Sequence, residues 1–174
     1  WAGFPSVGLA WRINEESFVK DLGVFYNLKL RFGYGRSGNT AIPSYRSLLT
    51  IASSFYPMYG SDLSYGASID RPANPSLRWE TTDMVNLGLD MSFFKNSLDV
   101  SMDFYVKKTS DMLLNMPIPS FGAFPNSPFF NAGDLKNTGF EIVVNYRNQI
   151  GKDFNYNVGL NMSTYKTEVT KLTS

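Results

Sequence analysis

The sequence lacks cysteine and histidine entirely, and it contains no long hydrophobic run. Without cysteine, the chain has no disulfide framework, thiol nucleophile or cysteine-ligated metal. Without histidine, it loses the commonest general base, the usual catalytic triads and most zinc sites. No stretch of about 18 apolar residues is present, which excludes a transmembrane helix. A membrane barrel stays possible, because barrel strands give a much weaker hydropathy signal.

An excess of charge of one sign is also missing, because 16 basic residues stand against 15 acidic ones. This balance gives no reason to expect nucleic acid or an acidic partner. From the missing cysteine and histidine together with the balanced charge, we expect no catalytic residue, no cofactor, no metal site and no nucleic-acid partner. The opening "WAGFPSVGLA" has neither the basic start nor the cleavage site of a signal peptide, and it already has the pattern of a strand. We expect the chain to be part of a longer protein.

The sequence is rich in strict alternation of apolar and polar residues, most clearly over 85–104. The apolar residues there keep odd numbers first and even numbers later: Val85, Leu87, Leu89, Met91 and Phe93, then Leu98, Val100, Met102 and Phe104. A period of two predicts strands with one apolar face. The pattern predicts an all-β chain of about six antiparallel strands, at about 4–13, 25–36, 79–94, 97–109, 138–148 and 154–165. Val143 is the one exception to the alternation in the fifth strand.

The phase of the alternation predicts the lengths of the tight turns. Facing residues of an antiparallel hairpin share a face, so the phase switch at "FKNS" requires an even-length turn, either Lys95-Asn96 or Phe94 to Ser97. Asparagine suits the left-handed backbone of such a turn. The phase does not switch between the fifth and sixth strands, which predicts a three-residue loop, "QIG", with Gly151 in the left-handed conformation.

The connections alternate between short and long, and we expect the long ones at about 37–77 and 110–137. Aromatic residues of the apolar face lie near both strand ends: Trp11, Tyr26, Phe93, Tyr146, Phe154 and Tyr156 near the short turns, and Tyr34, Trp79, Phe104 and Phe140 near the long connections. Both features are typical of a transmembrane β-barrel with short periplasmic turns and long extracellular loops. The alternative is a soluble β-sandwich, whose strands also alternate but are usually shorter.

In a barrel, one face of each strand meets lipid and the other meets the lumen. The residues that we expect to face lipid are Leu87, Leu89, Met91, Val100, Met102, Ile142, Val144 and Leu160. The residues that we expect to face the lumen are Lys29, Arg31, Asn86, Asp90, Asp99, Asp103, Glu141, Asn145 and Arg147. Two of these carboxylates could form a glycoside-hydrolase pair, but we favour a hydrated wall with solvated or paired charges.

The long connections hold the candidates for contacts with a ligand or a lid. These are Trp79 and the loop aromatics Phe55, Tyr56, Tyr59, Tyr65, Phe121, Phe124, Phe129 and Phe130. Aromatic side chains can stack on sugar rings or grip peptides, and proline stiffens a loop. Packing of the loops against each other explains the same residues equally well. "GYGRSG" contains a G-x-G-x-x-G spacing, but no helix is predicted after it, so we interpret it as a strand end and loop.

Several segments taken together resemble one family of membrane transporters. They are "NPSLRWET", "YVKKTSDML" at the end of the fourth strand, and "NAGDLKNTGFE", and the segments "FPSVGLAWRINEESF" and "LKLRFGYGRSGN" add to them. With these motifs the chain resembles the SusC/RagA family of TonB-dependent outer-membrane transporters, over about Phe4 to Val169. The resemblance implies an internal segment of a large barrel, since six strands are fewer than the eight of the smallest closed barrels.

The resemblance also implies a function for the whole protein. Members import nutrients too large for porins, glycans or oligosaccharides and sometimes peptides, across the bacterial outer membrane. A SusD-like surface lipoprotein caps the barrel, and TonB supplies energy through an N-terminal plug domain; this chain contains neither the plug nor the TonB box. The partners implied are outer-membrane lipid, the lipoprotein, TonB and the substrate. Two alternatives remain, a non-energised porin or adhesin barrel and a soluble carbohydrate-binding β-sandwich.

Overall fold

The computed structural model describes residues 3–39, 42–55, 58–59, 62–63, 66–115 and 126–172, with the backbone alone at 54–55, 58–59 and 62–63. The chain divides into two compact units. The first contains residues 1–37, 82–109 and 135–170, and the second contains residues 38–81, 110–134 and 171–174. We describe each unit by itself.

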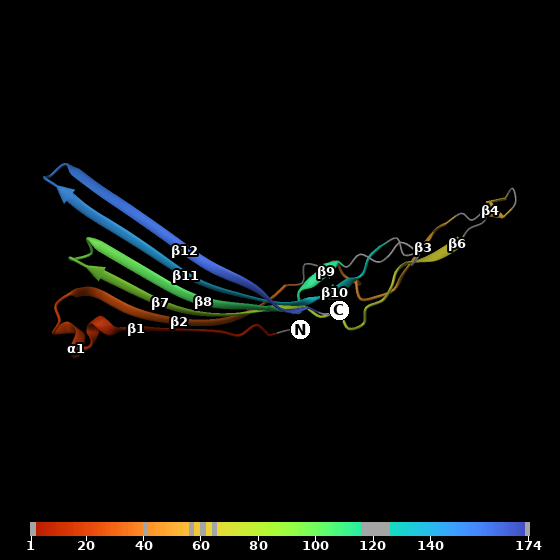
Figure 1. Ribbon diagram of the computed structural model, residues 1–174, viewed down its shortest axis with the longest axis horizontal. Coiled ribbons are helices and arrows are strands. Elements are labelled where there is room, and N and C mark those ends of the chain that lie inside the picture. The colour runs from red at the N-terminus through yellow and green to blue at the C-terminus, as the bar shows by residue number, and fades with distance from the viewer. Residues whose placement is uncertain are drawn as a thin grey trace. The chain divides into compact units, whose positions relative to one another are not determined.

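The main element of the fold is a six-stranded sheet in the order β1-β2-β7-β8-β11-β12 (Figure 1). Its strands are β1 (Ser6–Arg12), β2 (Phe25–Asn39), β7 (Glu80–Phe93), β8 (Leu98–Ser110), β11 (Gly133–Ile150) and β12 (Phe154–Leu172). The pairs β1–β2 and β8–β11 are antiparallel. A short 3-10 helix (Ile13–Glu15) and the helix α1 (Ser17–Lys20) connect β1 to β2. The all-β class and the six-stranded antiparallel sheet are therefore as the alternation predicts.

The two long connections contain strands of their own, which the sequence pattern did not predict. In the first, β3 (Thr50–Phe55) pairs with β6 (Gly66–Arg71), and β4 (Met58–Tyr59) pairs with β5 (Asp62–Leu63). In the second, β9 (Leu113–Asn115) pairs with β10 (Phe129–Asn131). The β3–β6 register is irregular and the other strands have two or three residues, so none of them offers a long alternating pattern.

Three strands of the main sheet are longer than predicted, β2 and β11 at ends that adjoin a long connection and β12 at its C-terminal end. β2 continues to Asn39 rather than 36, β11 begins at Gly133 rather than 138, and β12 continues to Leu172 rather than 165. The added residues are mostly polar, as in "DLKNT", but the ladder continues through backbone pairs such as Leu135↔Thr109. Backbone pairing needs no apolar alternation, so the hydrophobic pattern ends before the strand does.

The two tight turns have the predicted parity. Phe94 to Ser97 form a four-residue turn between β7 and β8, the longer of the two even lengths expected. Phe94, Lys95 and Asn96 have positive φ angles of 51, 54 and 69°. The turn between β11 and β12 has three residues, but it comprises Gly151 to Asp153 rather than 149–151, because β11 continues through Ile150. Gly151 has the expected left-handed backbone, with φ 67°.

The apolar face of the main sheet is largely uncovered. Leu9 on β1 is 65% exposed and Leu160 on β12 is 68% exposed, whereas the buried hydrophobic residues of the described chain are Val19 and Ala132. By contrast, Gly88, Ser92 and Gly139 are buried on the polar face. A soluble sandwich would cover its apolar face with a second sheet, and the described residues provide none. The described residues also contain no helix that is long and apolar enough to cross a membrane.

Candidate functional site: the polar face of the sheet

An arginine and two aspartates join three neighbouring strands on the polar face. Arg31 of β2 donates to both carboxylate oxygens of Asp90 on β7, from Nε at 2.8 Å and from Nη2 at 2.9 Å. Its Nη2 also donates to Asp103 of β8 at 3.0 Å. The Ser101 hydroxyl donates to Asp90 at 2.8 Å. The cluster neutralises much of its own charge, as expected for a hydrated wall and not for a pair of catalytic carboxylates.

Gly88 provides the space in which the Arg31 guanidinium lies. A Cβ atom at position 88 would come within 2.6 Å of Arg31 Cζ and within 2.7 Å of Asp103 Oδ1. Any larger residue would therefore displace the guanidinium from the two carboxylates. Gly8, on the same face of β1, has nothing within 4 Å of such an atom. Glycine is therefore required at position 88 but not, by this criterion, at position 8.

A second polar cluster lies nearer the short turns. Asp99 of β8 forms an ion pair with Arg147 of β11 and accepts a hydrogen bond from the Ser92 hydroxyl at 2.7 Å. Asp99 and Asn145 are cross-strand partners, as are Asp103 and Glu141. The carboxylates of β8 on this face are therefore engaged by arginine, one by Arg147 and the other by Arg31.

The part of the polar face formed by β11 and β12 has few charges. Tyr105 of β8 lies over Gly139, its cross-strand partner, because a Cβ atom at 139 would meet the tyrosine ring at 2.4 Å. Asn145 leans over Gly159 in a similar way, with its Oδ1 2.9 Å from the corresponding position. Val143, the exception to the alternation, is 40% exposed between these features. Besides the charged Glu141 and Arg147, this half of the face therefore offers carboxamides, the rings of Tyr105 and Tyr165, and the aliphatic side chains of Val143 and Val169.

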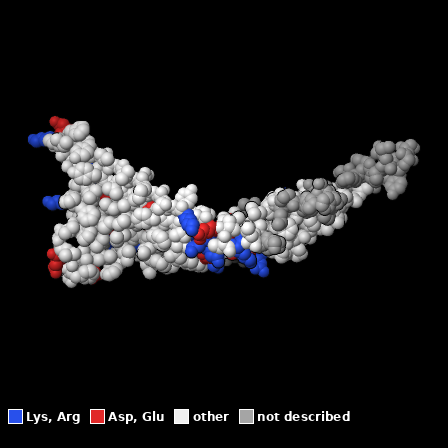
Figure 2. All heavy atoms as spheres, in the orientation of Figure 1, with Lys and Arg blue, Asp and Glu red and all other residues white. Residues whose placement is uncertain are grey.

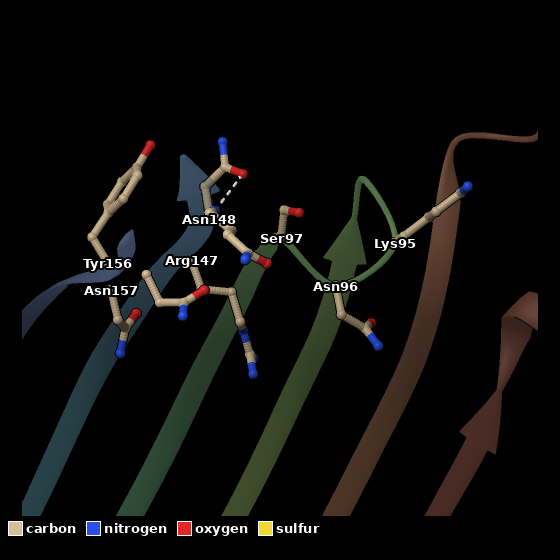
Figure 3. Close-up of a pocket in the computed structure, with 9 residues that line it drawn as sticks. Lys95, Asn96, Ser97, Arg147, Asn148, Tyr156 and Asn157 are labelled. Carbon is tan, nitrogen blue, oxygen red and sulfur yellow. Dashed lines mark hydrogen bonds between the residues drawn. The ribbon is translucent and has the colours of Figure 1, made fainter. Parts of the chain in front are cut away.

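A pocket of ≈ 560 Å³ lies at the short-turn end of this half (Figure 3). It is lined by Lys95, Asn96, Ser97, Arg147, Asn148, Gln149, Asn155, Tyr156 and Asn157. In Figure 3, Arg147, Asn96 and Asn157 point the same way, whereas Asn148 and Tyr156 point the opposite way. The Asn148 carboxamide donates a hydrogen bond to the Tyr146 hydroxyl and accepts one from the backbone N–H of Gln149. The pocket is rich in carboxamides.

The apolar face is bounded at both ends by aromatic and charged residues. Near the short turns, Phe93 packs against Phe25 with ring centroids 5.2 Å apart, and Tyr146 packs against Tyr156 at 6.0 Å. Near the long connections, the Tyr34 hydroxyl donates to Asp83, which also pairs with Arg36 at 2.7 Å. Charged side chains gather at both ends of the sheet, and the face between them carries few (Figure 2).

The cross-strand register groups the predicted face residues consistently. Met102 pairs with Ile142 and Val100 pairs with Val144 on the apolar face. On β7, Leu87 is exposed, whereas Leu89 and Met91, which are also expected to face lipid, are half-buried. On the polar face, Lys29 pairs with Arg12 of β1, and Asn86 lies beside Gly33 of β2. Which of the two faces meets lipid stays a prediction.

The predicted ligand contacts in the long connections are only partly described. Trp79 is 44% exposed and Phe130 is 38% exposed, whereas Phe129 is half-buried with the Arg46 guanidinium 5.7 Å from its ring centroid. For Phe55 of β3 and Tyr59 of β4 the backbone alone is described, and Tyr56, Tyr65, Phe121 and Phe124 lie outside the described residues. Both interpretations of these aromatics, ligand contact and loop packing, therefore remain open.

Within the second unit, two asparagines of the sequence motifs form hydrogen bonds that join the two long connections. The Asn131 carboxamide accepts from the Arg78 backbone N–H and donates to the carbonyls of Arg78 and Asp111, all at 2.8–2.9 Å. Asn74 donates to the Phe129 carbonyl at 2.8 Å. These asparagines come from "NPSLRWET" and "NAGDLKNTGFE". The sequence marked them as motif residues but gave no signal of their partners.

Comparisons with a family model and with known proteins all point to the same family. A family model described as TonB dependent receptor-like, β-barrel, matches residues 1–173. TonB-dependent receptor P3 of Formosa agariphila is 37% identical over 172 residues, 99% of this chain and 17% of that protein. TonB-dependent receptor SusC of Bacteroides thetaiotaomicron is 35% identical over 176 residues, 99% of this chain and 18% of that protein.

Solved structures agree with the sequence comparison. The structure of the RagAB peptide transporter matches 97% of this chain with a TM-score of 0.82 and 33% identity, and the match covers 18% of that chain. A structure of the RagAB peptide importer in its 'closed-closed' state gives a TM-score of 0.83. The chain thus spans less than a fifth of the relatives that it matches, at 17 or 18% of their length. The chain belongs to the TonB-dependent receptor-like β-barrel family, with SusC and RagAB as relatives, and its sheet is a segment of a larger barrel.

Proposed function

We propose that the whole protein is an outer-membrane importer of large nutrients that is energised through TonB and works with a SusD-like surface lipoprotein. The observation that carries this proposal is the reversed polarity of the sheet, with exposed apolar side chains on one face and half-buried, paired polar groups on the other. A bilayer is the environment in which such a face is stable. The similarity to SusC and RagAB supports import as the use of the barrel.

Within that protein, the chain forms part of the barrel wall. The apolar face meets lipid, with the row of Phe93, Tyr146 and Tyr156 at the periplasmic interface and the Tyr34–Asp83–Arg36 cluster at the outer one. The polar face, with the Arg31 cluster, lines the lumen. The four-residue and three-residue turns lie on the periplasmic side, and the long connections form extracellular loops, as is usual for such barrels.

The substrate is a glycan, an oligosaccharide or a peptide. RagAB is described as a peptide transporter, which supports peptides, and the SusC/RagA resemblance supports glycans as well. The ligand is contacted by Trp79 and the loop aromatics Phe129 and Phe130, together with the aromatics of the first long connection. Loops on a rigid scaffold are the usual place for recognition, because they vary without disturbing the barrel.

Deletion of the full-length gene in its host tests this proposal. We expect loss of growth on at least one polymeric glycan or peptide mixture as sole nutrient, restored by the intact gene only in cells that have TonB. The epitope-tagged protein should fractionate with the outer membrane and co-purify with a surface lipoprotein. Uptake that continues without TonB would support a porin instead, and recovery in the soluble fraction would support the β-sandwich.

A further inference from the structure

Two lysines oppose each other on the apolar face, near the long connections. Lys108 of β8 and Lys136 of β11 are direct cross-strand partners, and both are exposed. They share a face with Met102 and Ile142, because alternate residues of a strand point to the same side. Like charges directly opposite each other destabilise a pair of strands. An anion held between the two ammonium groups of this lysine pair would turn the repulsion into attraction.

The carboxylates around the lysine pair are engaged by other groups. Asp83 of β7 and Glu168 of β12 attract the pair from the two neighbouring strands. Asp83, however, is held by Arg36 at 2.7 and 2.9 Å, and Glu168 pairs with Lys166 at 2.5 Å. Asp134, farther along β11, accepts a backbone N–H. The strands on both sides of the pair are described, and no carboxylate of the described residues forms an ion pair with either lysine.

The lysine pair lies at the outer border of the apolar band. A strand rises about 3.4 Å per residue, so Lys136 is about 34 Å along β11 from Tyr146, which belongs to the aromatic row at the short turns. At a barrel tilt of about 40°, this separation is about 26 Å along the membrane normal, close to the apolar band of about 25 Å in such barrels. In the proposed orientation, the ammonium groups therefore lie at the level of the outer-leaflet headgroups.

The two ends of the apolar face differ in composition. At the short turns its strand residues are rings in mutual contact, such as Tyr146, Phe154 and Tyr156. At the other end, charged side chains gather, and the lysine pair lies among them (Figure 2). Aromatic rows suit either membrane interface, whereas clustered lysines suit a leaflet with fixed negative charge. The outer leaflet of a bacterial outer membrane is rich in a glycolipid whose disaccharide headgroup carries phosphate, and its charge is complementary to the pair.

We propose that Lys108 and Lys136 form a clamp for a phosphate group of the outer-leaflet glycolipid. The phosphate accepts hydrogen bonds from both ammonium groups, and the acyl chains of the same lipid lie along the apolar band, where Phe104 and Phe140 are cross-strand partners. Lysine suits this role because its flexible stem follows the apolar surface while its charge reaches the headgroup. This inference rests on the proposed lipid contact of the apolar face and adds to it a site for one lipid.

Protection of the two amines from acetylation tests the clamp at the level of single residues. The purified full-length protein in neutral detergent is labelled with an amine-reactive acetyl ester, and each lysine is quantified by peptide mass spectrometry. The probes are diphosphoryl lipid A, the same lipid after phosphatase treatment, phosphatidylglycerol and inorganic phosphate. We expect diphosphoryl lipid A to slow the labelling of Lys108 and Lys136 at least tenfold, and each other probe to slow it less than twofold. Lys107, on the polar face of β8, should react equally in all samples.

Substitutions separate a two-lysine clamp from general charge attraction. Lys108→Gln should reduce the protection of Lys136 about fivefold, because one lysine near a phosphorylated surface is worth about that factor in affinity. The matched variant Lys107→Gln removes the same charge from the other face and should leave the protection unchanged. In detergent without lipid, Lys108→Gln should unfold at the same urea concentration as wild type or a higher one, since it removes a like-charge contact. Clear destabilisation there would mean that the lysine is paired within the protein, which would overturn the clamp.

The outcomes also separate this inference from the proposed function. Equal labelling with and without diphosphoryl lipid A would overturn the clamp, and so would equal protection by the phosphatase-treated lipid, phosphatidylglycerol or inorganic phosphate. Protection by a co-purified lipoprotein in the absence of lipid would assign the lysine pair to that partner and overturn the clamp as well. If the protein still fractionates with the outer membrane and supports TonB-dependent growth, the import function stands without the clamp. Recovery of the protein in the soluble fraction would overturn both.

Discussion

The two faces of the main sheet obey opposite rules of burial. On the polar face, Arg31, Asp90 and Asp103 lie together in hydrogen-bond contact and are half-buried. On the apolar face, side chains such as Leu9 and Leu160 stand exposed without a covering layer among the described residues. In a soluble protein the apolar face would be covered and the charges would be exposed. The difference shows that the stabilising contacts of this sheet are polar and internal, while its apolar face requires a neighbour other than water.

The largest effect should come from placing a charge on the apolar face. Ile142→Arg in the full-length protein puts a guanidinium in the middle of β11, opposite Met102. If that face meets lipid, the cost is about 2–4 kcal/mol near the bilayer midplane. We expect a strong loss of folded protein in the outer-membrane fraction, measured by heat-modifiable mobility on gels.

The adjacent residue is the matched control for that substitution. Glu141→Arg introduces the same guanidinium on the polar face, opposite Asp103. A cation beside that carboxylate is acceptable, and we expect near-normal insertion. Equal loss of folded protein in the two variants would refute the assignment of the faces.

The next effect concerns the space under Arg31. Gly88→Ala places a methyl group within 2.6 Å of the guanidinium and should push it away from Asp90 and Asp103. Loss of a half-buried charged hydrogen-bond network costs about 1–3 kcal/mol. We expect a lower urea midpoint for the folded full-length protein. Gly8→Ala, on the same face with open space around it, should unfold like wild type, and an equal decrease there would show that the cost is one of strand backbone and not of the network.

A smaller effect should follow from neutralising one partner of the cluster. Asp90→Asn removes one of the two ion pairs of Arg31 and leaves Asp103 in place. The side chains of Arg31 and Asp90 are 32 and 29% exposed, so water and salt screen the interaction and we expect about 0.5–1 kcal/mol. The difference from wild type in urea unfolding should shrink at high salt. Asp153→Asn, in the exposed turn after Gly151, serves as the control, and a difference that does not respond to salt would argue against an electrostatic origin.

The contrast between the faces could be predicted from the sequence, but the contacts within them could not. Alternation is a local property, so it correctly grouped Met102 with Ile142 and Asp103 with Glu141 once the strands paired. The Arg31 cluster depends on β2 lying beside β7, which a long connection separates from it in the chain. No local signal gives that register, and the role of Gly88 follows from it.

The structure of the long connections was even harder to predict from local sequence patterns. Their short strands pair over two to six residues, too few for a period of two to stand out. The sequence pattern therefore predicts only loops at about 37–77 and 110–137, although β3 to β6 and β9 to β10 lie within them. Asn74 and Asn131 could be recognised as motif residues, but their hydrogen bonds to backbone groups depend on distant segments. Strand extension by "DLKNT" was missed for a similar reason, because backbone pairing carries no hydrophobic pattern.

The smallest expected effect on stability comes from a residue outside both faces of the sheet. It serves as a reference for the larger effects expected on the faces. Glu15 lies in the exposed connection between β1 and β2, where Lys20 Nζ is 3.1 Å and Arg12 Nη2 is 3.5 Å from its carboxylate oxygens. The hydrogen bond and charge of Lys20 hold the pKa of Glu15 below its ordinary value, with a smaller contribution from Arg12. A lowered pKa means that the ion pairs stabilise the folded state above the pKa of the unfolded chain, and that this contribution is lost as the pH falls through the lower, folded value.

Glu15→Gln should therefore leave urea unfolding at neutral pH nearly unchanged, because exposed ion pairs contribute little. Any small difference from wild type should vanish on acidification below the ordinary range of glutamate, where both proteins carry a neutral side chain. The measurement is a pair of urea titrations, one at neutral and one at acid pH. A difference as large as that of Asp90→Asn would mean that this exposed turn stabilises the sheet as much as one ion pair of the polar face does.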